Sequence, residues 1–330
     1  MANEGLTNTE VMTLLELPED TISILQTAQG SVFTAKNNEF LTALYNKITA
    51  QVVDSVKFTN PFKKYDGFPI KYGDTIENVW VELPKGYAFD KDATDPFTKV
   101  APSVKALYAS VNYEMQYQTT IQDSLIRRAV LSEYGLMNLI TQIIGALNKS
   151  KSIDEYFATI AMLNNENLFA GGITEVERGA DKEATAKKVT ETIVNVVTDF
   201  ALPQTTNNAL EVLNATEKRD VLLIIKNELL NSINLDYLTG VYNLSKVDLV
   251  NNIIPVKSFQ VKDDSGELRG EDIDFMIIDE TGFDNHVALE DGGLIYNPKG
   301  KYTNHFYNLW KIIAYKYFYN AKAFKLVDAE

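Results

Sequence analysis

Apolar residues recur at helical spacing in several stretches of this chain. From Leu136 to Leu147 they are separated by alternating steps of three and one, which is typical of an amphipathic helix. The segment Ser152 to Glu155 has the spacing of a capping box, and it predicts a second helix that ends near 171–172. Helices are also expected from Val189 to Phe200 and over 38–53. The polar remainder of 38–53 suggests that this helix lies on another surface instead of sitting in a core.

Alternating apolar residues predict strands elsewhere. A strand is predicted from Ile76 to Leu83, where Val79, Val81 and Leu83 alternate, and apolar residues occupy every second position from Leu107 to Tyr117. Buried or aromatic strands are expected at 221–226, 253–259 and 275–279, and over most of 302–326, with two short helices at 234–242 and 245–250. Helices and strands do not alternate regularly, so the sequence predicts an α+β fold.

The first two strands are expected to belong to one extended, two-stranded excursion of the chain. Residues 60–103 contain five of the nine prolines of the chain, so this stretch cannot form regular helix. A two-stranded excursion is only marginally stable alone in water. We therefore expect it to pack on something else, such as another subunit.

Composition excludes several kinds of site. The chain has 330 residues and no cysteine, so disulfides, thiolate metal sites and cysteine nucleophiles are excluded. Only His286 and His305 could act as imidazole ligands or bases. A pI near 4.7 argues against a surface built to hold polyanions. There is no basic, apolar leader at the N-terminus and no apolar run of membrane-spanning length, so we expect synthesis in a cytoplasm and no membrane association.

The negative charge is concentrated in one segment. Residues 262–291 hold eleven acids and two bases, a net −9 of the total −14. A solvated acidic loop explains this, as does attraction to basic segments of other copies.

Catalytic motifs are missing from the sequence. Phosphate loops, dinucleotide-binding turns, nucleophile elbows and zinc-protease helices do not occur. The acidic run 263–267 places its glycine too early for a calcium loop. His286 lies close in sequence to Asp284, Glu290 and Asp291. It is interpreted as a histidine that is either hydrogen-bonded within the fold or exposed, and not as a general base. No catalytic, cofactor-binding or metal-binding residue is predicted, and we expect the protein not to be an enzyme.

Several phrases resemble one known family in order and spacing. The phrases that carry the resemblance are Asn60-Pro61-Phe62-Lys63-Lys64, Gly73-Asp74-Thr75-Ile76-Glu77, Tyr117 to Asp123, Asp154-Glu155-Tyr156, Asn234 to Val250, Tyr296 to Tyr302, Trp310 and Asn320 to Phe324. Together they are similar to the major capsid proteins of phi29-like tailed phages.

The resemblance implies the Hong Kong 97-type capsid fold. Its parts would be an N-terminal arm at 1–55, an extended loop with its two strands at 56–118, a peripheral domain with a spine helix at 119–200 and 296–330, and an apical domain at 201–295. Some members of the family continue into an immunoglobulin-like domain. This chain ends at Glu330, so no role of such a domain is expected.

The implied function is structural. Copies would form hexamers and pentamers, and these an icosahedral shell around packaged double-stranded DNA, in a virion assembled in the bacterial cytoplasm. The implied partners are other copies of the chain, a scaffolding protein, a portal and the nearby DNA. Two alternatives stay open: a nanocompartment shell of the encapsulin type that encloses cargo, and a soluble enzyme with an acidic site at 262–291.

Overall fold

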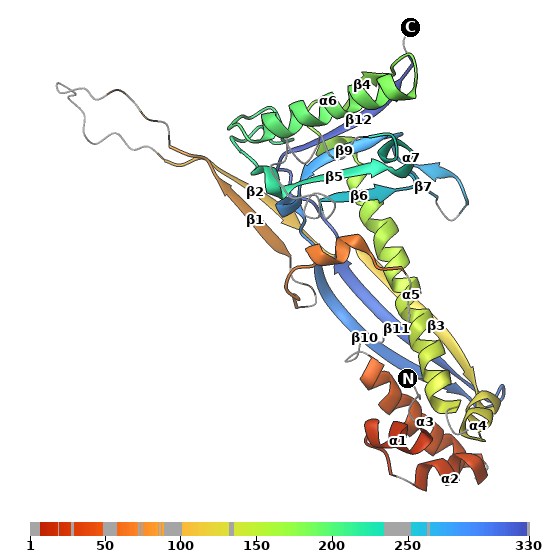
Figure 1. The fold of residues 1–330 in the computed structure, drawn as a ribbon. Coiled ribbons are helices and arrows are strands. Elements are labelled where there is room, and N and C mark those ends of the chain that lie inside the picture. Colours follow the sequence, from red (N-terminus) through yellow and green to blue (C-terminus); the bar gives the residue numbers. More distant parts are fainter. Residues whose placement is uncertain are drawn as a thin grey trace.

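The protein is long and narrow, with a ribbon that leaves it sideways (Figure 1). A five-stranded sheet forms one end, and a long helix runs from it to a group of short helices at the other end. The computed structural model describes residues 7–18, 20–27, 30–48, 58–71, 73, 75–84, 86, 88, 101–131, 135–233, 252–262 and 265–328.

The five-stranded sheet has a buried centre. Its order is β4 (Ile173–Glu177), β12 (Ala321–Val327), β9 (Phe275–Asp279), β5 (Val221–Lys226) and β6 (Ile253–Val256). The predicted strands at 221–226 and 275–279 are confirmed, whereas the strand predicted at 253–259 ends at Val256.

Helix α6 (Lys182–Phe200) packs on one face of this sheet, and its predicted apolar stripe forms the contact. Successive residues of β5 point to opposite faces. Leu223 therefore packs in the core under α6, while Leu222 packs in the second core between sheet and long helix. Both faces are covered, which explains why β5 is apolar throughout.

The long helix α5 (Gly135–Leu163) corrects one prediction. Two helices were expected, the second opened by Ser152 and ending near 171–172. The helix is instead continuous through Ser152 and ends at Leu163. Glu155 is buried against the neighbouring sheet and is not at a helix end. A capping-box spacing cannot act as a start signal where the preceding turn is already helical and packed.

A three-stranded antiparallel sheet lies along α5. Its order is β10 (His286–Asn297), β11 (Tyr302–Ile312) and β3 (Tyr113–Gln122). Tyr307 and Leu309 of β11 point into the core, and alternate residues such as Phe306 and Asn308 lie on the other face. The aromatic C-terminal segment therefore is strand, as predicted, and it divides between β11 and β12.

The second alternating strand is broken in two, which also corrects a prediction. β2 (Val104–Ala109) pairs with β1 (Ile76–Val81) in a separate ribbon, whereas β3 belongs to the three-stranded sheet. Asn112 marks the break. Its side chain donates to the carbonyl of Ile313 at 2.8 Å and accepts from the amide of Ile313 at 2.9 Å. These two hydrogen bonds fix the chain where it passes from the ribbon to the three-stranded sheet, and the alternation of apolar residues continues across that point.

The N-terminal helices form part of the core at the far end. They are α1 (Asn8–Leu14), α2 (Asp20–Thr27) and α3 (Gly30–Ile48), and α4 (Asp123–Leu131) lies beside them. Phe33, Phe40 and Leu41 of α3 are buried with Tyr307 and Leu309 of the sheet. The expectation that this helix sits outside a core is therefore wrong. Its buried face includes the polar Asn37 beside the apolar Phe33, Phe40 and Leu41, and this face closes the end of the molecule.

Short elements complete the described chain. They are η1 (Pro61–Tyr65), η2 (Glu166–Leu168), η3 (Lys218–Asp220), α7 (Asn227–Leu230), β7 (Val261–Lys262), β8 (Leu268–Arg269) and η4 (Glu280–Gly282). The two short helices expected at 234–242 and 245–250 lie outside the described residues. The proposed domain boundaries stay a prediction, and the five-stranded sheet joins strands from 173–177, 221–279 and 321–327.

Asn164, just after α5, ties the long helix to the sheet end. Its side chain accepts from the amide of Glu271 and donates to the carbonyls of Glu271 and Phe259, all at 3.0–3.1 Å. Gly270 is needed beside it, because a Cβ there would lie 2.2 Å from Nδ2 of Asn164.

We expect Asn164→Ala to lower the free energy of unfolding by about 2–3 kcal/mol, because it leaves buried backbone groups unpaired. Urea denaturation followed by circular dichroism would measure this. Asn167→Ala, at an exposed position three residues further on, is a matched control with an expected loss below about 1 kcal/mol. Equal losses for the two variants would contradict the assignment.

Candidate intersubunit surface

The segment before the ribbon, here called the strap (residues 58–71), crosses the middle of the molecule. Asn60 caps its short helix η1 by accepting from the amide of Phe62 at 3.0 Å. The ring of Phe62 is buried between those of Tyr156 and Phe283, at 5.8 and 5.9 Å. The strap is therefore anchored in the second core and gives the ribbon a fixed origin.

An ion triad holds the strap to both the sheet and the long helix. Nζ of Lys311 lies 2.7 Å from a carboxylate oxygen of Asp66 and 3.2 Å from one of Glu155. Only 4% of the Lys311 side chain is exposed. A buried ammonium group needs such partners, because burying an unpaired charge is costly.

His286 holds the last part of the strap. Its Nδ1 lies 2.8 Å from the carbonyl oxygen of Phe68, and its Nε2 lies 3.2 Å from Asp284. A side chain at Gly67 would collide with the imidazole, since a Cβ there would lie 2.6 Å from its Cε1. His286 is thus a buried, hydrogen-bonded residue of the fold, in keeping with its interpretation from sequence.

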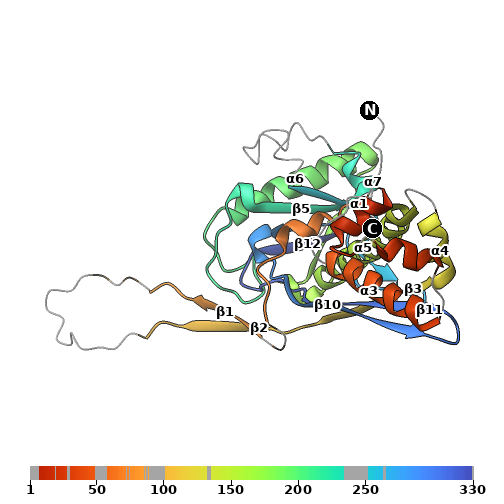
Figure 2. The same cartoon turned by 90° about the horizontal axis from the view of Figure 1, so that it is seen from below.

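One face of the ribbon is fixed to the body. The indole of Trp80 stacks on Phe318 with ring centroids 5.7 Å apart. Asn78 donates to the carboxylate of Asp284 at 2.6 Å, and Lys105 donates to a backbone carbonyl, that of Leu210, at 2.6 Å. These contacts reach three separate parts of the chain, so the ribbon leaves the body in a defined direction (Figure 1 and Figure 2).

The other face of the ribbon is apolar and open. Val79, Val81 and Val104 are 52%, 55% and 54% exposed, and the pairing of β1 with β2 places them on one side. Tyr108 lies on the same side and donates to Glu77 at 2.8 Å. Contiguous exposed apolar residues mark interaction surfaces in soluble proteins. This face has the character of a protein interface.

Sequence reasoning found the ribbon but missed its anchors. The alternation in 76–81 separates Trp80 and Asn78 from Val79 and Val81, and could have revealed two faces. The Lys311 triad could not have been found, because its members come from residues 66, 155 and 311 and no spacing links them.

Polar side chains also connect the long helix to the three-stranded sheet. Lys151 of α5 donates to Glu290 and to the hydroxyl of Tyr307, both at 2.9 Å, and Tyr307 also donates to Glu290. Burial would raise the pKa of Glu290, but the hydrogen bonds from Tyr307 and Lys151 outweigh it and lower the pKa.

His305, on the buried face of β11, makes folding sensitive to acid. Burial lowers its pKa from 6.5 to about 4. The unfolded chain therefore binds a proton between pH 6.5 and pH 4 that the folded chain does not, and stability is lost as pH falls through that window. We expect His305→Leu to remove about 3 kcal/mol of the stability difference between pH 7 and pH 4. Urea titrations at both pH values, with His286 unchanged, would measure it, and an unaltered pH dependence would refute it.

The acids of 262–291 are dispersed among structural contacts. Asp284, for example, binds both His286 and Asn78, and Asp274 accepts from the amide of Leu326 at 2.7 Å. The acids with contacts to other residues of the chain include Asp272, Asp274, Asp279, Glu280, Asp284, Glu290 and Asp291. Asp263 and Asp264 lie outside the described residues. This distribution does not favour the alternative of one acidic catalytic site.

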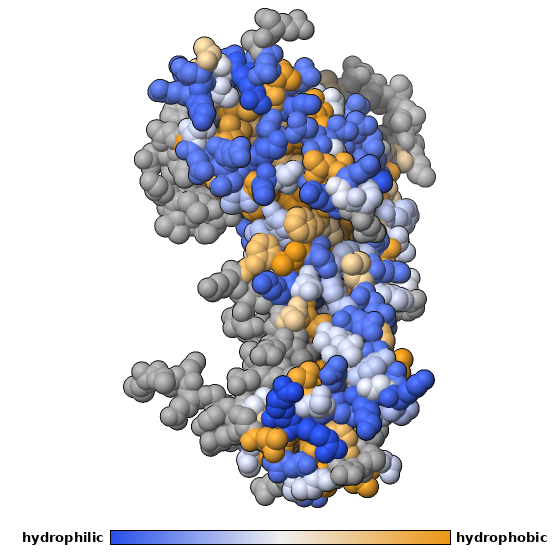
Figure 3. All heavy atoms as spheres, turned by 90° about the vertical axis from the view of Figure 1, so that its right-hand side faces the viewer, coloured by the Kyte–Doolittle hydropathy of each residue, from blue (hydrophilic) through white to orange (hydrophobic). Residues whose placement is uncertain are grey.

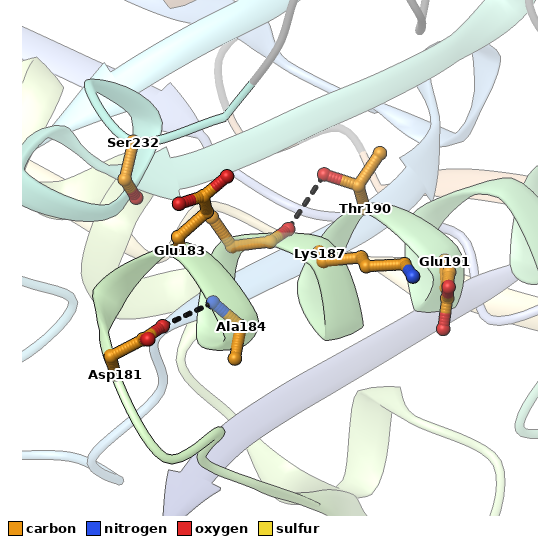
Figure 4. A pocket seen from close by; sticks show the side chains of 8 residues that line it. Asp181, Glu183, Ala184, Lys187, Thr190, Glu191 and Ser232 are labelled. Carbon is orange, nitrogen blue, oxygen red and sulfur yellow. Dashed lines mark hydrogen bonds between the residues drawn. The ribbon is translucent and has the colours of Figure 1, made fainter.

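A groove lies beside α6 on the surface of the protein. It has a volume of about 710 Å³ and is lined by Asp181, Glu183, Lys187, Glu191 and Ser232, among others. Figure 4 shows that Asp181 points back to the amide of Ala184, at 2.7 Å, as a helix cap. Lys187 and Glu191 lie along the open flank of the helix. The arrangement is that of a solvated helix surface.

Metal and membrane features were also sought. In the described ranges, His, Asp and Glu side chains do not gather in groups of three or more that could hold a metal ion. Within the same ranges, every helix is too short or too polar to cross a bilayer.

Solved structures with similar folds are phage capsid proteins. The capsid structure of Staphylococcus phage Andhra matches with a TM-score of 0.62 at 12% identity, and covers 84% of this chain and 87% of that chain. The mature capsid of bacteriophage PhiM1 matches with a TM-score of 0.56 at 8% identity, over 85% of this chain and 91% of that chain. The chain therefore has the Hong Kong 97-type fold of phage capsid proteins, as the sequence predicted.

Sequence comparison identifies the family. Residues 19–325 match the family described as Phi29-like phage major capsid protein. The major capsid protein of Bacillus phage B103 is 28% identical over 298 residues, which cover 88% of this chain. The chain spans 64% of that relative's length, and 79% of the major capsid protein of Streptococcus phage Cp-1, to which it is 26% identical over 84% of its own length. The chain belongs to the Phi29-like phage major capsid protein family.

Proposed function

We propose that this protein is the structural subunit of a phage head. Copies associate through the ribbon, whose open face carries Val79, Val81 and Val104 and lies on the next copy. That face is the observation that carries the proposal, because a fixed, projecting and apolar surface has no use in an isolated subunit. Membership in the capsid family supports the same role and favours it over a nanocompartment.

The expected contact is weak for each pair of copies. Six residues in each strand extend about 20 Å, and a ribbon of that size buries less than the roughly 1,200–2,000 Å² of a stable pair. A closed shell multiplies such contacts, so weak pairs still give a stable assembly.

The assembly consists of hexamers and pentamers around double-stranded DNA, in a virion assembled in the cytoplasm of a bacterial host. Further partners are a scaffolding protein and a portal. The net charge of −14 suits a wall along which DNA moves, because tight phosphate contacts need lysine and arginine. The subunit catalyses no reaction.

Negative-stain electron microscopy of the purified protein tests the proposal, alone and with a scaffolding protein of a related phage. Shells or ring-shaped capsomers are the expected result. A monodisperse monomer in every condition, up to millimolar protein, would overturn it.

A further inference from the structure

One buried lysine lies between two carboxylates that come from distant parts of the chain. Lys311 is on β11, Asp66 is on the strap and Glu155 is on α5. The strap crosses the middle part of the molecule, which in Figure 3 is narrower than the sheet end above it. The three side chains therefore meet where the two ends of the molecule are joined.

The amine and one of the carboxyl groups are close enough to react. Nζ of Lys311 lies 2.7 Å from Oδ1 of Asp66. The carboxyl carbon is one C–O bond further, so Nζ is at most about 3.9 Å from it. Reacting atoms in well-oriented intramolecular reactions are about 3–3.5 Å apart. A small rotation of either side chain brings the nitrogen to that distance.

Backbone pairing holds both residues in place. Asp66 forms a parallel β-bridge with Asn285. Lys311 is paired on both sides within the three-stranded sheet, with Val287 on β10 and Tyr113 on β3. Neither segment can move away without losing these pairs, so the two side chains remain close to each other. Such fixed proximity replaces a bimolecular encounter and favours a bond between them.

Water has little access to the groups that would react. The side chains of Lys311 and Glu155 are 4% and 7% exposed. The exclusion of water limits the solvation that would otherwise compete for the amine and the carboxylates. The side chain of Asp66 is 25% exposed, which gives a released water molecule a route to the solvent.

We propose that Lys311 and Asp66 form an isopeptide bond within the subunit, with Glu155 as the group that transfers protons. Glu155 takes a proton from the ammonium group, and the nitrogen lone pair attacks the carboxyl carbon of Asp66. Of the three ammonium protons, one stays on the amide nitrogen and Glu155 passes the other two to the departing oxygen. A C–N bond forms, a C–O bond breaks and one water molecule leaves, so no other reactant is needed.

The reaction occurs once in each subunit, without turnover, and it starts from the ion triad. The stability of the triad itself is therefore measured on newly refolded protein, before the bond has formed. The bond joins positions 245 residues apart in a chain that has no cysteine with which to form a disulfide. Like a disulfide, it restricts the unfolded chain, and it fixes the strap to the sheet. The inference does not depend on the proposed function.

Intact-mass measurement of the denatured protein tests the proposal. We expect a species lighter than the chain by one water molecule, and its share should grow when the folded protein is incubated. Fragmentation of a protease digest should identify a branched peptide that joins the segments around residues 66 and 311. An unchanged mass and unbranched peptides after prolonged incubation, in free subunits and in shells alike, would overturn the proposal.

A second route to water loss has to be separated from this one. Asp66 precedes Gly67, and an aspartate before a glycine can cyclise onto its own backbone as a succinimide. Lys311→Met leaves that route open and removes the isopeptide bond, so the lighter species should disappear in this variant. A loss of water that persists in Lys311→Met, without a branched peptide in the unsubstituted protein, would contradict the bond.

Glu155→Gln tests the proton transfer, because it keeps the shape of the side chain and leaves both reacting groups in place. We expect the bond to form more slowly by roughly tenfold or more in protein that circular dichroism shows to be folded. An unchanged rate would overturn the role of Glu155.

Another ion triad in the same chain is a matched control. Lys226 lies 2.8 Å from Asp274 and 2.9 Å from Asp272, but its side chain is 25% exposed and that of Asp272 is 51% exposed. Because water reaches these groups, we expect no branched peptide at Lys226 in the same digest. A branch there as well would contradict the requirement for burial.

Discussion

Replacing three valines on the open face of the ribbon by threonine should raise the protein concentration needed for assembly more than tenfold while leaving the subunit folded. The variant is Val79→Thr, Val81→Thr and Val104→Thr. Threonine keeps the shape and strand preference of valine, and these side chains are half-exposed, so we expect the free energy of unfolding to change by less than about 1 kcal/mol. At an interface, each buried hydroxyl would instead replace a methyl group that gains about 1 kcal/mol from burial.

The loss is repeated at every contact of a closed shell. With two or more kcal/mol lost per contact, the concentration at which assembly begins should rise more than tenfold, since about 1.4 kcal/mol corresponds to a factor of ten. Light scattering against protein concentration measures this. Val32→Thr, an equally exposed position on α3, is the control, and normal assembly of the triple variant would remove the ribbon face from the interface.

The largest loss of stability is expected from Lys311→Met. Methionine fills a similar volume, but Glu155 then remains buried without its cationic partner. Removing one member of a buried ion pair typically costs 3–5 kcal/mol, and we expect about that much here. Thermal and urea denaturation would record it as a lower melting temperature and a lower midpoint.

A double variant separates charge from packing. Lys311→Met with Glu155→Gln removes both buried charges, and we expect it to recover at least half of the loss. Lys316→Met, on the partly exposed connection after β11, should have little effect. A double variant as unstable as Lys311→Met alone would show that packing of the lysine, not its charge, stabilises the strap.

Deleting most of the proline-rich excursion, for example residues 62–100, would be unsuitable as a test of the ribbon. It would remove Phe62 from the second core and Asp66 from Lys311. The strap looks like part of the excursion in the sequence because prolines and glycines continue through it. Its role as an anchor depends on residues more than 80 positions away, such as Tyr156 and Phe283.

Periodicity located the ribbon strands and the helix α6, because one face of each packs on the body and the other does not. The strands β5 and β9 were located by unbroken apolar runs, because both of their faces are buried. It failed at α5, where a polar turn around Ser152 was interpreted as a helix boundary. Lys151 and Glu155 of that turn bind Tyr307 and Lys311 of the sheet, so polar residues are buried in pairs where the pattern indicated a surface. A single sequence cannot distinguish a polar residue with a buried partner from an exposed one.

By itself, the sequence determined the α+β class, the paired strands of the ribbon and the membership in a capsid family, because each depends on local spacing or on residues kept in order. Only the tertiary structure decided that the ribbon has one anchored and one open face, and that the acids of 262–291 are mostly bound within the chain. Those properties depend on contacts between distant segments, such as Trp80 with Phe318, and such contacts exist only after the chain has folded.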